Sequence, residues 1–310
     1  MPSVQIFIAT YNRPLLLEAA INSTLNQDFD SFEVIISDNS TNDETEKLIS
    51  RFRDNRLKYI KRRPSLSSFT EHFNVIMQDV TAEYFMIFHD DDIMCENMVS
   101  TLINEIEKNK LAIAIGANAF VYINKRLQKK LFRKKNQNQI VKDRNEMAEN
   151  YLNSDILPLP SYLYKREVAT TLIFDFNSGG KHADVSFLMN VSDLGHVINM
   201  DTPLMYYHFH NSQVSSDFDY PALNSLTNYI IKTTRFIKTD NEILKFRAMH
   251  LYIHSLMRLK DPSNTMYGWR NRKTLRILFY VYPFNYFLKF CIKLILTKGD
   301  NYNFIKKIIK

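Results

Sequence analysis

The chain has 310 residues, of which 45% are hydrophobic and 13% aromatic, so it is long and apolar enough to bury a substantial core. Its only cysteines, Cys95 and Cys291, lack any Cys or His ligand spacing, which argues against a disulfide framework and against a structural zinc site. The net charge of +7 is concentrated at the C-terminus, because residues 258–310 carry 12 Lys and Arg against two Asp.

The N-terminus enters strand-like sequence at once, without a basic segment and a long apolar core, so we expect no secretory signal. Together with the low cysteine content, this predicts a cytoplasmic protein. A basic run at 125–135 has seven cations and no acid, which could bind nucleic acid or form a solvated face. Because aromatic strand motifs and glycine-rich clamps of RNA-binding proteins are absent from the sequence, we expect no nucleic-acid partner.

Short apolar runs alternate with amphipathic stretches through the first 123 residues. The runs are rich in β-branched and aromatic residues and predict strands at 4–9, 32–37, 57–61, 84–88 and 111–123. Helical spacing predicts helices at 13–27, 42–53, 67–78 and 96–109. This alternation implies βαβ units, and hence an α/β fold whose central sheet is mainly parallel and flanked by helices.

The second half is less regular. Residues 182–195 predict a helix that ends at Gly195, followed by strands at 196–200 and 203–210. From about Tyr220 onward the spacing is helical. We therefore expect a catalytic or binding domain over 1–216 and a helical, basic and aromatic region over 217–310.

The segment 275–296 is aromatic and apolar, but Pro283, Lys289 and Lys293 interrupt it. A spanning helix needs about 20 mostly apolar residues, so these interruptions disfavour a transmembrane segment. An interfacial amphipathic helix fits better, and the surrounding excess of Lys and Arg favours contact with anionic lipid. A helix packed on the protein core, or one that forms a homodimer, remains open.

Polar residues follow three of the predicted strands: Thr10 the first, Asp38 the second, and Asp90, Asp91 and Asp92 the fourth. Because ligands bind at the carboxyl ends of parallel strands, these segments should face one crevice. Clustered carboxylates repel each other unless a cation lies among them, and oxygen ligands suit Mg²⁺ or Mn²⁺. Taken alone, Asp38 could equally close an Asx-turn.

Four segments, in order, resemble the GT-A family of inverting glycosyltransferases, family 2, which use nucleotide-activated sugars. They are "IFIATYNRPLLLEAAINSTLNQDFDSFEVIISDNSTNDET", "EYFMIFHDDDIMCENMV", "GGKHADVSFLMNVSDLG" and "PLMYYHFHNSQVSS". The resemblance covers about residues 4–216. It implies a Rossmann-like GT-A domain that binds a nucleoside-diphosphate sugar, with UDP favoured.

The resemblance also implies roles for individual residues. The donor would be bound by Thr10, Tyr11, Arg13, Asp38, Asn74 and Asp90. A Mn²⁺ or Mg²⁺ ion would be held by Asp91, Asp92 and His210. Asp184 would be the general base that deprotonates the acceptor hydroxyl, although by its sequence position alone it could simply cap the helix that follows.

Some positions depart from the family pattern. Asp184 is preceded by Ala183 instead of the frequent glutamate, and His208 stands where many members have an arginine. Phe73 precedes Asn74 where many members carry an arginine. Lys61, Arg62 and Arg63 could neutralise the nucleotide in its place.

We therefore expect an inverting glycosyltransferase that modifies a saccharide acceptor in bacterial capsule or O-antigen synthesis. The acceptor could be undecaprenyl-linked, with the protein peripheral on the inner face of the cell membrane. The alternative is a non-catalytic nucleotide-binding scaffold in glycan assembly. A nucleotidyltransferase is disfavoured because no Lys/Arg-rich glycine loop follows the first strand.

Overall fold

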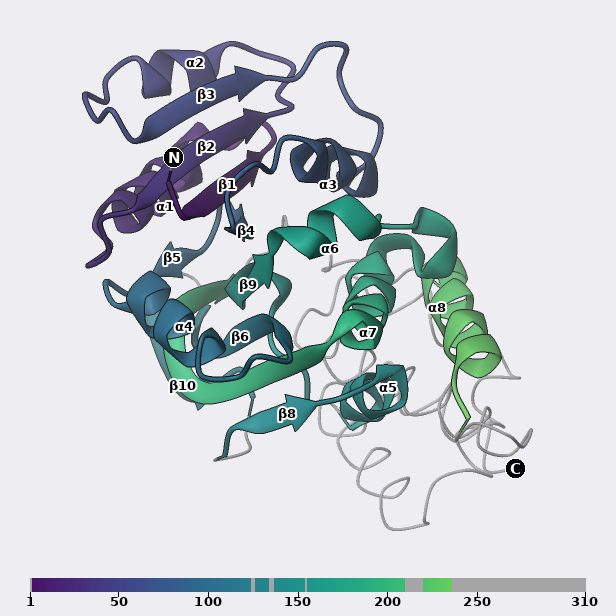
Figure 1. The fold of residues 1–310 in the computed structure, drawn as a ribbon. Helices are drawn as coiled ribbons and strands as arrows, with labels where there is room; N and C mark the ends of the chain where they lie inside the picture. The colour runs from purple at the N-terminus through teal and green to yellow at the C-terminus, as the bar shows by residue number, and fades with distance from the viewer. Residues whose placement is uncertain (1, 124–125, 134–136, 154, 210–219, 236–310) are drawn as a thin grey trace, which may run out of the picture. The chain divides into compact units, whose positions relative to one another are not determined.

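The computed structural model describes residues 2–123, 126–133, 137–153, 155–209 and 220–235 (Figure 1). His210 and the segment 275–296 lie outside these residues. The chain divides into two compact units, 1–234 and 235–310, and helix α8 (Tyr220–Thr233) lies in the first unit. In the described part of the chain, no helix has both the length and the apolar character needed to span a membrane.

Alternating strands and helices build the first half of the sheet. In chain order these elements are β1 (Val4–Thr10), α1 (Pro14–Leu25), β2 (Phe32–Asp38), α2 (Glu44–Ile49), β3 (Leu57–Lys61), α3 (Phe69–Gln78) and β4 (Tyr84–His89). Their strands lie in the order β3-β2-β1-β4 and are all parallel. The register pairs Thr10 with Asp38 and Ala9 with His89, so the carboxyl ends of β1, β2 and β4 coincide as predicted.

The second half continues the same sheet in the order β4-β9-β6-β10-β5, with β7 beside β6 and β8 beside β10. Its elements are β5 (Ile93–Met94), α4 (Met98–Ile106), β6 (Ala112–Ile123), β7 (Arg126–Leu131), β8 (Gln139–Val141), α5 (Arg144–Leu152), β9 (Tyr162–Lys165), α6 (Arg166–Thr171), α7 (Ala183–Leu194) and β10 (His196–Phe209). Short 3-10 turns lie at η1 (Leu159–Ser161), η2 (Phe176–Ser178) and η3 (Gly180–His182).

Strand direction is mixed in this half. Strand β10 runs parallel to β6, whereas β5, β7, β8 and β9 pair antiparallel. These short strands were not predicted, because few of them show a run of alternating residues long enough to recognise. The two strands expected at 196–200 and 203–210 form one strand whose register shifts around Pro203. An α/β fold is confirmed, with a parallel first half and a mixed second half.

Local sequence explains where the helices begin and end. The Ser68 hydroxyl accepts from the Glu71 N–H, and the Glu71 carboxylate accepts from the Ser67 N–H, which together form a capping arrangement at the start of α3. Helix α7 ends at Gly195 as predicted. A Cβ at Gly195 would lie 2.7 Å from the Leu111 carbonyl oxygen, so the close approach of the chain to β6 requires glycine there.

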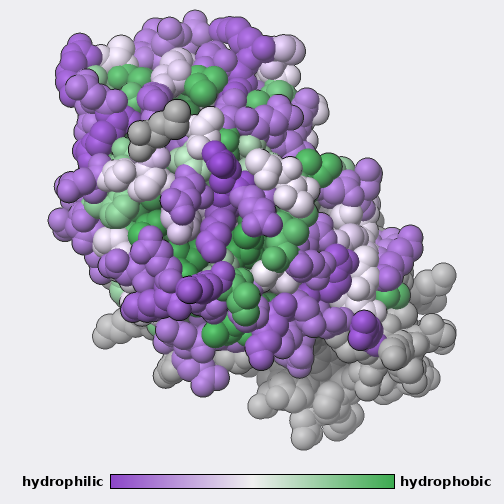
Figure 2. Space-filling model, viewed as in Figure 1, coloured by the Kyte–Doolittle hydropathy of each residue, from purple (hydrophilic) through white to green (hydrophobic). Residues whose placement is uncertain are grey.

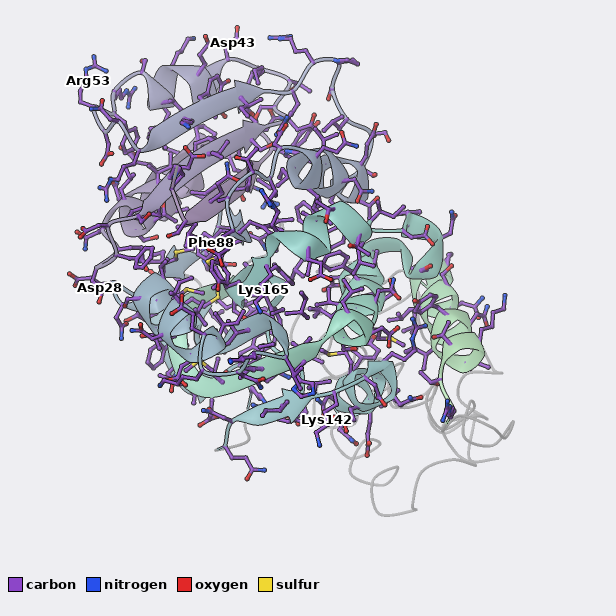
Figure 3. All side chains as sticks on the ribbon, viewed as in Figure 1. Asp28, Asp43, Arg53, Phe88, Lys142 and Lys165 are labelled. Atoms are coloured by element: carbon purple, nitrogen blue, oxygen red, sulfur yellow. The ribbon has the colours of Figure 1, made fainter. Side chains whose placement is uncertain are left out.

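The sheet has an apolar layer on each face. Helices α1 and α4 bury residues such as Leu17 and Leu102 against one face. On the other face, Tyr164 of β9 stacks on Phe85 of β4 and contacts Phe187 of α7 edge to face. In Figure 3, Phe88 near the end of β4 lies among interior side chains, and the face in Figure 2 is mostly hydrophilic with scattered hydrophobic patches. The acidic segment thus follows a strand that is buried on both sides.

Candidate functional site

The ends of β1 and β4 are joined by direct hydrogen bonds. The Thr10 hydroxyl donates to Asp90 Oδ2 over 2.7 Å. Arg13 Nη1 lies 3.3 Å from Asp90 Oδ1 and 3.2 Å from Asp91 Oδ2. The two aspartates are buried, so one guanidinium partly compensates two carboxylates that are removed from water. We call Thr10, Arg13, Asp90 and Asp91 the strand-end cluster.

The loop after β1 is tied to the loop after β2. Asn12 has a φ of 54°, a conformation that asparagine tolerates better than most residues, and its N–H donates to Ser40 Oγ over 2.8 Å. The Asn12 side chain also bonds Thr41. Tyr11, which precedes Asn12 in the same loop, is 51% exposed. The predicted meeting of the two loops is confirmed, and Tyr11 presents its ring outside them.

Asp38 is fully buried and held by several donors. Its Oδ1 accepts from the Ser40 N–H, which is the Asx-turn expected as one of its roles. Its Oδ2 accepts from the Tyr59 hydroxyl and from Lys61 Nζ, at 2.8 and 2.9 Å. Burial by itself would raise the pKa of Asp38, but these hydrogen bonds outweigh it and lower the pKa. Both carboxylate oxygens of Asp38 thus accept hydrogen bonds from other groups of the protein.

Lys61, Arg62 and Arg63 were proposed to replace the arginine that many family members carry before Asn74, and the three side chains have different partners. Lys61 pairs with Asp38, and Arg62 donates to Ser37 Oγ and to Asp79. Arg63 has an exposed side chain, 3.7 Å from Asp43. Among the described cations near the strand ends, Arg13 is the one that touches the acidic segment.

Burial strongly affects the acidic segment. It raises the pKa of Asp90 to about 6, with a further increase from the neighbouring charge of Asp91, while Thr10 and Arg13 act in the opposite direction. Burial also raises the pKa of Asp92 well above its ordinary value, again with a contribution from Asp91. Burial therefore favours the neutral form of Asp90 and Asp92, and a bound cation would stabilise their ionised form.

Asp92 has one satisfied oxygen and one unsatisfied oxygen. Its Oδ1 accepts from the His208 N–H over 2.9 Å. Its Oδ2 is buried and has no hydrogen-bond partner among the described residues. An ionised oxygen in this state is costly unless a cation binds it, so Asp92 fits the metal-ligating role that the resemblance implied.

His89, Asp91 and Asp92 form a cluster whose ligand atoms all lie within 4.8 Å of one another, so they could hold a metal ion. Burial lowers the pKa of His89, which keeps its imidazole neutral and able to ligate. His89 was not predicted, because a histidine that ends an apolar strand carries no ligand signature of its own. His210, which was predicted, lies outside the described residues.

Asp184 lies in the first turn of α7, where His182 and not Asp184 is the cap residue. Burial raises the pKa of Asp184 to about 6, although the N–H of Val185 limits the increase. The pKa of Tyr164 is raised by burial and also by the negative charge of Asp184. Because Tyr164 stacks on Phe85, and Phe85 and His89 point to the same side of β4, Asp184 lies on the same face of the sheet as His89.

Asn74 serves an internal role in the structure. Its amide donates to the Phe174 carbonyl over 2.9 Å and accepts from the Phe174 N–H over 2.7 Å. The preceding Phe73 stacks on His89, with ring centroids 6.0 Å apart. Helix α3 thus connects the segment before α7 to the end of β4.

Comparison with known proteins identifies the family. Residues 5–172, more than half of the chain, match glycosyl transferase family 2. A Campylobacter jejuni relative, GalNAc(5)-diNAcBac-PP-undecaprenol beta-1,3-glucosyltransferase, is 31% identical over 107 residues, which span 34% of this chain and only 35% of that protein.

Two solved structures share the fold at low identity. One is the crystal structure of S. aureus TarS 1-349 in complex with UDP-GlcNAc, with a TM-score of 0.61, 16% identity, and coverage of 91% of this chain and 79% of that one. The other is the mannosyltransferase PcManGT from Pyrobaculum calidifontis in complex with GDP-Man and Mn²⁺, with a TM-score of 0.52, 14% identity, and coverage of 90% and 74%. The chain therefore has the GT-A fold and belongs to glycosyl transferase family 2.

Proposed function

We propose that the protein is an inverting glycosyltransferase that moves a sugar from a UDP-sugar to a hydroxyl of an undecaprenyl-linked saccharide in bacterial surface-glycan synthesis. The observation that carries this proposal is the strand-end cluster. In it, Thr10 at the end of β1 and Arg13 in the following loop hold Asp90 and Asp91 of the loop after β4. This arrangement lies at the carboxyl ends of parallel strands, where open α/β sheets bind their ligands.

The nucleotide would lie over the loops that follow β1 and β2. Tyr11 is exposed and can stack on a base, while Asp90, joined to Thr10, can accept hydrogen bonds from ribose hydroxyls. Asp38 would act by fixing the shape of the second loop through Ser40 and Lys61. The UDP-GlcNAc complex of TarS supports a UDP-sugar as donor.

Asp91 and Asp92 would hold a divalent cation, with His210 as a further ligand predicted from the sequence. When bound, such an ion stabilises negative charge on the diphosphate leaving group. Mn²⁺ is supported by its presence in the PcManGT structure. Arg13 would neutralise charge beside the same phosphates, since its guanidinium already reaches Asp91.

Asp184 would deprotonate the acceptor hydroxyl. One base is sufficient for inversion, because the hydroxyl attacks the anomeric carbon from the face opposite the leaving group. Burial brings the pKa of Asp184 to about 6, so at neutral pH the carboxylate is ionised and still basic enough to accept a proton. Its place at the start of α7 is on the same sheet face as His89.

The acceptor is proposed from the Campylobacter relative, whose name specifies an undecaprenol-linked substrate. The basic and aromatic C-terminal sequence would favour contact with anionic lipid at the inner face of the cell membrane. A homodimer formed through this region is the competing prediction for the same sequence.

The first experiment is thermal denaturation with UDP, GDP, CDP and TDP, each with and without Mn²⁺, in wild type, Asp91→Ala and Asp28→Ala. Asp28 is an exposed carboxylate at the molecular periphery and serves as the matched control (Figure 3). We expect a Mn²⁺-dependent stabilisation by UDP that Asp91→Ala loses and Asp28→Ala keeps.

Transfer is then tested with UDP-sugars and a synthetic undecaprenyl-diphosphate saccharide. Product formation that requires the lipid-linked acceptor supports the proposal. If UDP binds but no sugar is transferred to this acceptor or to water, the nucleotide-binding scaffold becomes the better explanation. A stabilisation by GDP and not by UDP would contradict the proposed donor.

A further inference from the structure

His89 is held in a fixed orientation beside the acidic segment. It is the last residue of β4, and its ring stacks on Phe73 of α3 with an interplanar angle of 24°. Its Nδ1 lies 3.8 Å from Asp92 Oδ2, which is too long for a hydrogen bond. The side chain is 30% exposed, so the imidazole edge is accessible from one side.

The unsatisfied oxygen of Asp92 indicates which kind of group would bind between Asp92 and His89. The Asp92 side chain is fully buried, and its Oδ2 has no hydrogen-bond partner among the described residues. Two ligands bound to one ion at about 2.1 Å each are separated by up to about 4.2 Å, and the 3.8 Å separation falls in this range. A small adjustment of these side chains would therefore let one ion bind both the carboxylate oxygen and the imidazole nitrogen.

We propose that His89 is an imidazole ligand of the divalent cation, together with Asp91 and Asp92, and that it makes the site selective for Mn²⁺ over Mg²⁺. This inference rests on the proposed cation-dependent transfer. Mg²⁺ prefers oxygen ligands and is usually bound by one or two carboxylates with substrate phosphates, whereas an imidazole nitrogen suits transition metals.

The ligand set also has a consequence for the order of binding. His89, Asp91 and Asp92 fall within four consecutive residues, and their ligand atoms lie within 4.8 Å of one another. With three protein ligands present, the cation does not need the donor phosphates to complete a minimal site. Mn²⁺ should therefore bind the donor-free protein, whereas Mg²⁺ should need UDP.

The test measures Mn²⁺ binding to the full-length, donor-free protein by the loss of the free-ion EPR signal, and nitrogen coupling to bound Mn²⁺ by electron spin-echo modulation. The variants are His89→Gln, His210→Gln and His196→Gln. His196 opens β10, at the opposite end of the strand from the acidic segment, and is the matched histidine control. Circular dichroism and thermal denaturation check that each variant is folded.

We expect His89→Gln to weaken Mn²⁺ binding at least about 10-fold and to reduce the nitrogen modulation, while His196→Gln changes neither. The preference for Mn²⁺ over Mg²⁺, measured by competition, should fall in His89→Gln. The proposal is overturned if His89→Gln keeps the wild-type Mn²⁺ affinity and nitrogen modulation, or if the nitrogen coupling is lost only in His210→Gln.

A separate measurement on the same samples tests the proposed function. Release of UDP from a UDP-sugar by wild type shows that the enzyme is active irrespective of which residue ligates the ion. Unchanged Mn²⁺ binding in His89→Gln with active wild type refutes the inference alone. No turnover by wild type, with Mn²⁺ bound, refutes the proposed function and leaves the ligand assignment standing.

Discussion

The Thr10 hydroxyl donates a 2.7 Å hydrogen bond to Asp90 Oδ2 and so joins the ends of β1 and β4. The neighbouring backbone pairing stops at Ala9 and His89, so this side-chain bond extends the connection between the two strands by one residue. It also places a buried carboxylate at a defined position, 3.3 Å from Arg13 Nη1. The geometry of the acidic segment therefore depends on Thr10, a residue to which the family resemblance gave a role in donor binding.

Thr10→Val should destabilise the donor-free protein by about 1.5–3 kcal/mol at pH 8, because a hydrogen bond to a charged, buried group is lost. The loss should be smaller at pH 5, where Asp90, whose pKa is about 6, is mostly protonated. Urea denaturation at the two pH values measures the effect. Thr10→Ser, which keeps the hydroxyl, should retain most of the stability, and an equal loss for Thr10→Val at both pH values would argue against the ionised bond.

Asp92→Asn should leave the melting temperature of the metal-free protein unchanged or raise it, because it removes a buried charge with one unsatisfied oxygen. The same substitution should abolish the stabilisation by Mn²⁺. Thermal denaturation with and without Mn²⁺ measures both effects. A clear decrease in the metal-free melting temperature would mean that the Asp92 charge is already compensated in the protein.

The contribution of Asp90 and Asp184 to the stability of the metal-free protein should decrease between about pH 4 and pH 6, opposite to that of His72, whose folded pKa is lowered to about 4. Asp90 and Asp184 both have a pKa of about 6 when folded, above the ordinary value of 3.8, so the folded state binds more protons than the unfolded state in this interval. Their contribution is present at pH 4 and is lost as the pH rises through 6. Asp184→Asn should flatten part of this dependence in urea denaturation curves recorded across this pH interval.

Asp184→Asn should reduce transfer by about 10²- to 10⁴-fold and leave UDP binding unchanged, because the amide cannot accept the acceptor proton. In wild type, the transfer rate should rise with pH through about 6 and level off above it, since the base must be ionised. A pH–rate profile and isothermal titration with UDP measure these effects. Loss of UDP affinity in Asp184→Asn would indicate a structural role at the start of α7.

Arg133→Met should cost about 3–5 kcal/mol of stability, because it removes the buried cation that hydrogen-bonds the buried Asp155 carboxylate. Arg133 is 1% exposed, and its Nε lies 2.6 Å from Asp155 Oδ1. Replacing both residues, as in Arg133→Met with Asp155→Leu, should recover much of the loss. Urea denaturation measures the free energy of unfolding of each variant. A double variant no more stable than Arg133→Met would show that Arg133 and Asp155 stabilise the protein by more than neutralising each other's charge.

Most of the parallel half of the fold could be predicted from the sequence. Strand β3 matches its predicted bounds, and β1, β2 and β4 differ by one residue, because buried parallel strands are continuous apolar runs bounded by polar turns. The short antiparallel strands such as β5 and β9 were not predicted. Their pairing depends on partners far away in the chain, which their own two and four residues do not specify.

The sequence by itself determined which chemical groups stand at the strand ends, since Thr10, Asp38 and Asp90 to Asp92 each follow an apolar run. Only the tertiary structure decided which groups each of these side chains contacts and how deeply each is buried. It buried Asp38 among donors from β3, joined Arg13 to Asp91, and turned His89 toward Asp92. These outcomes depend on distances between separate elements and on burial, and no local pattern of residues encodes either of them.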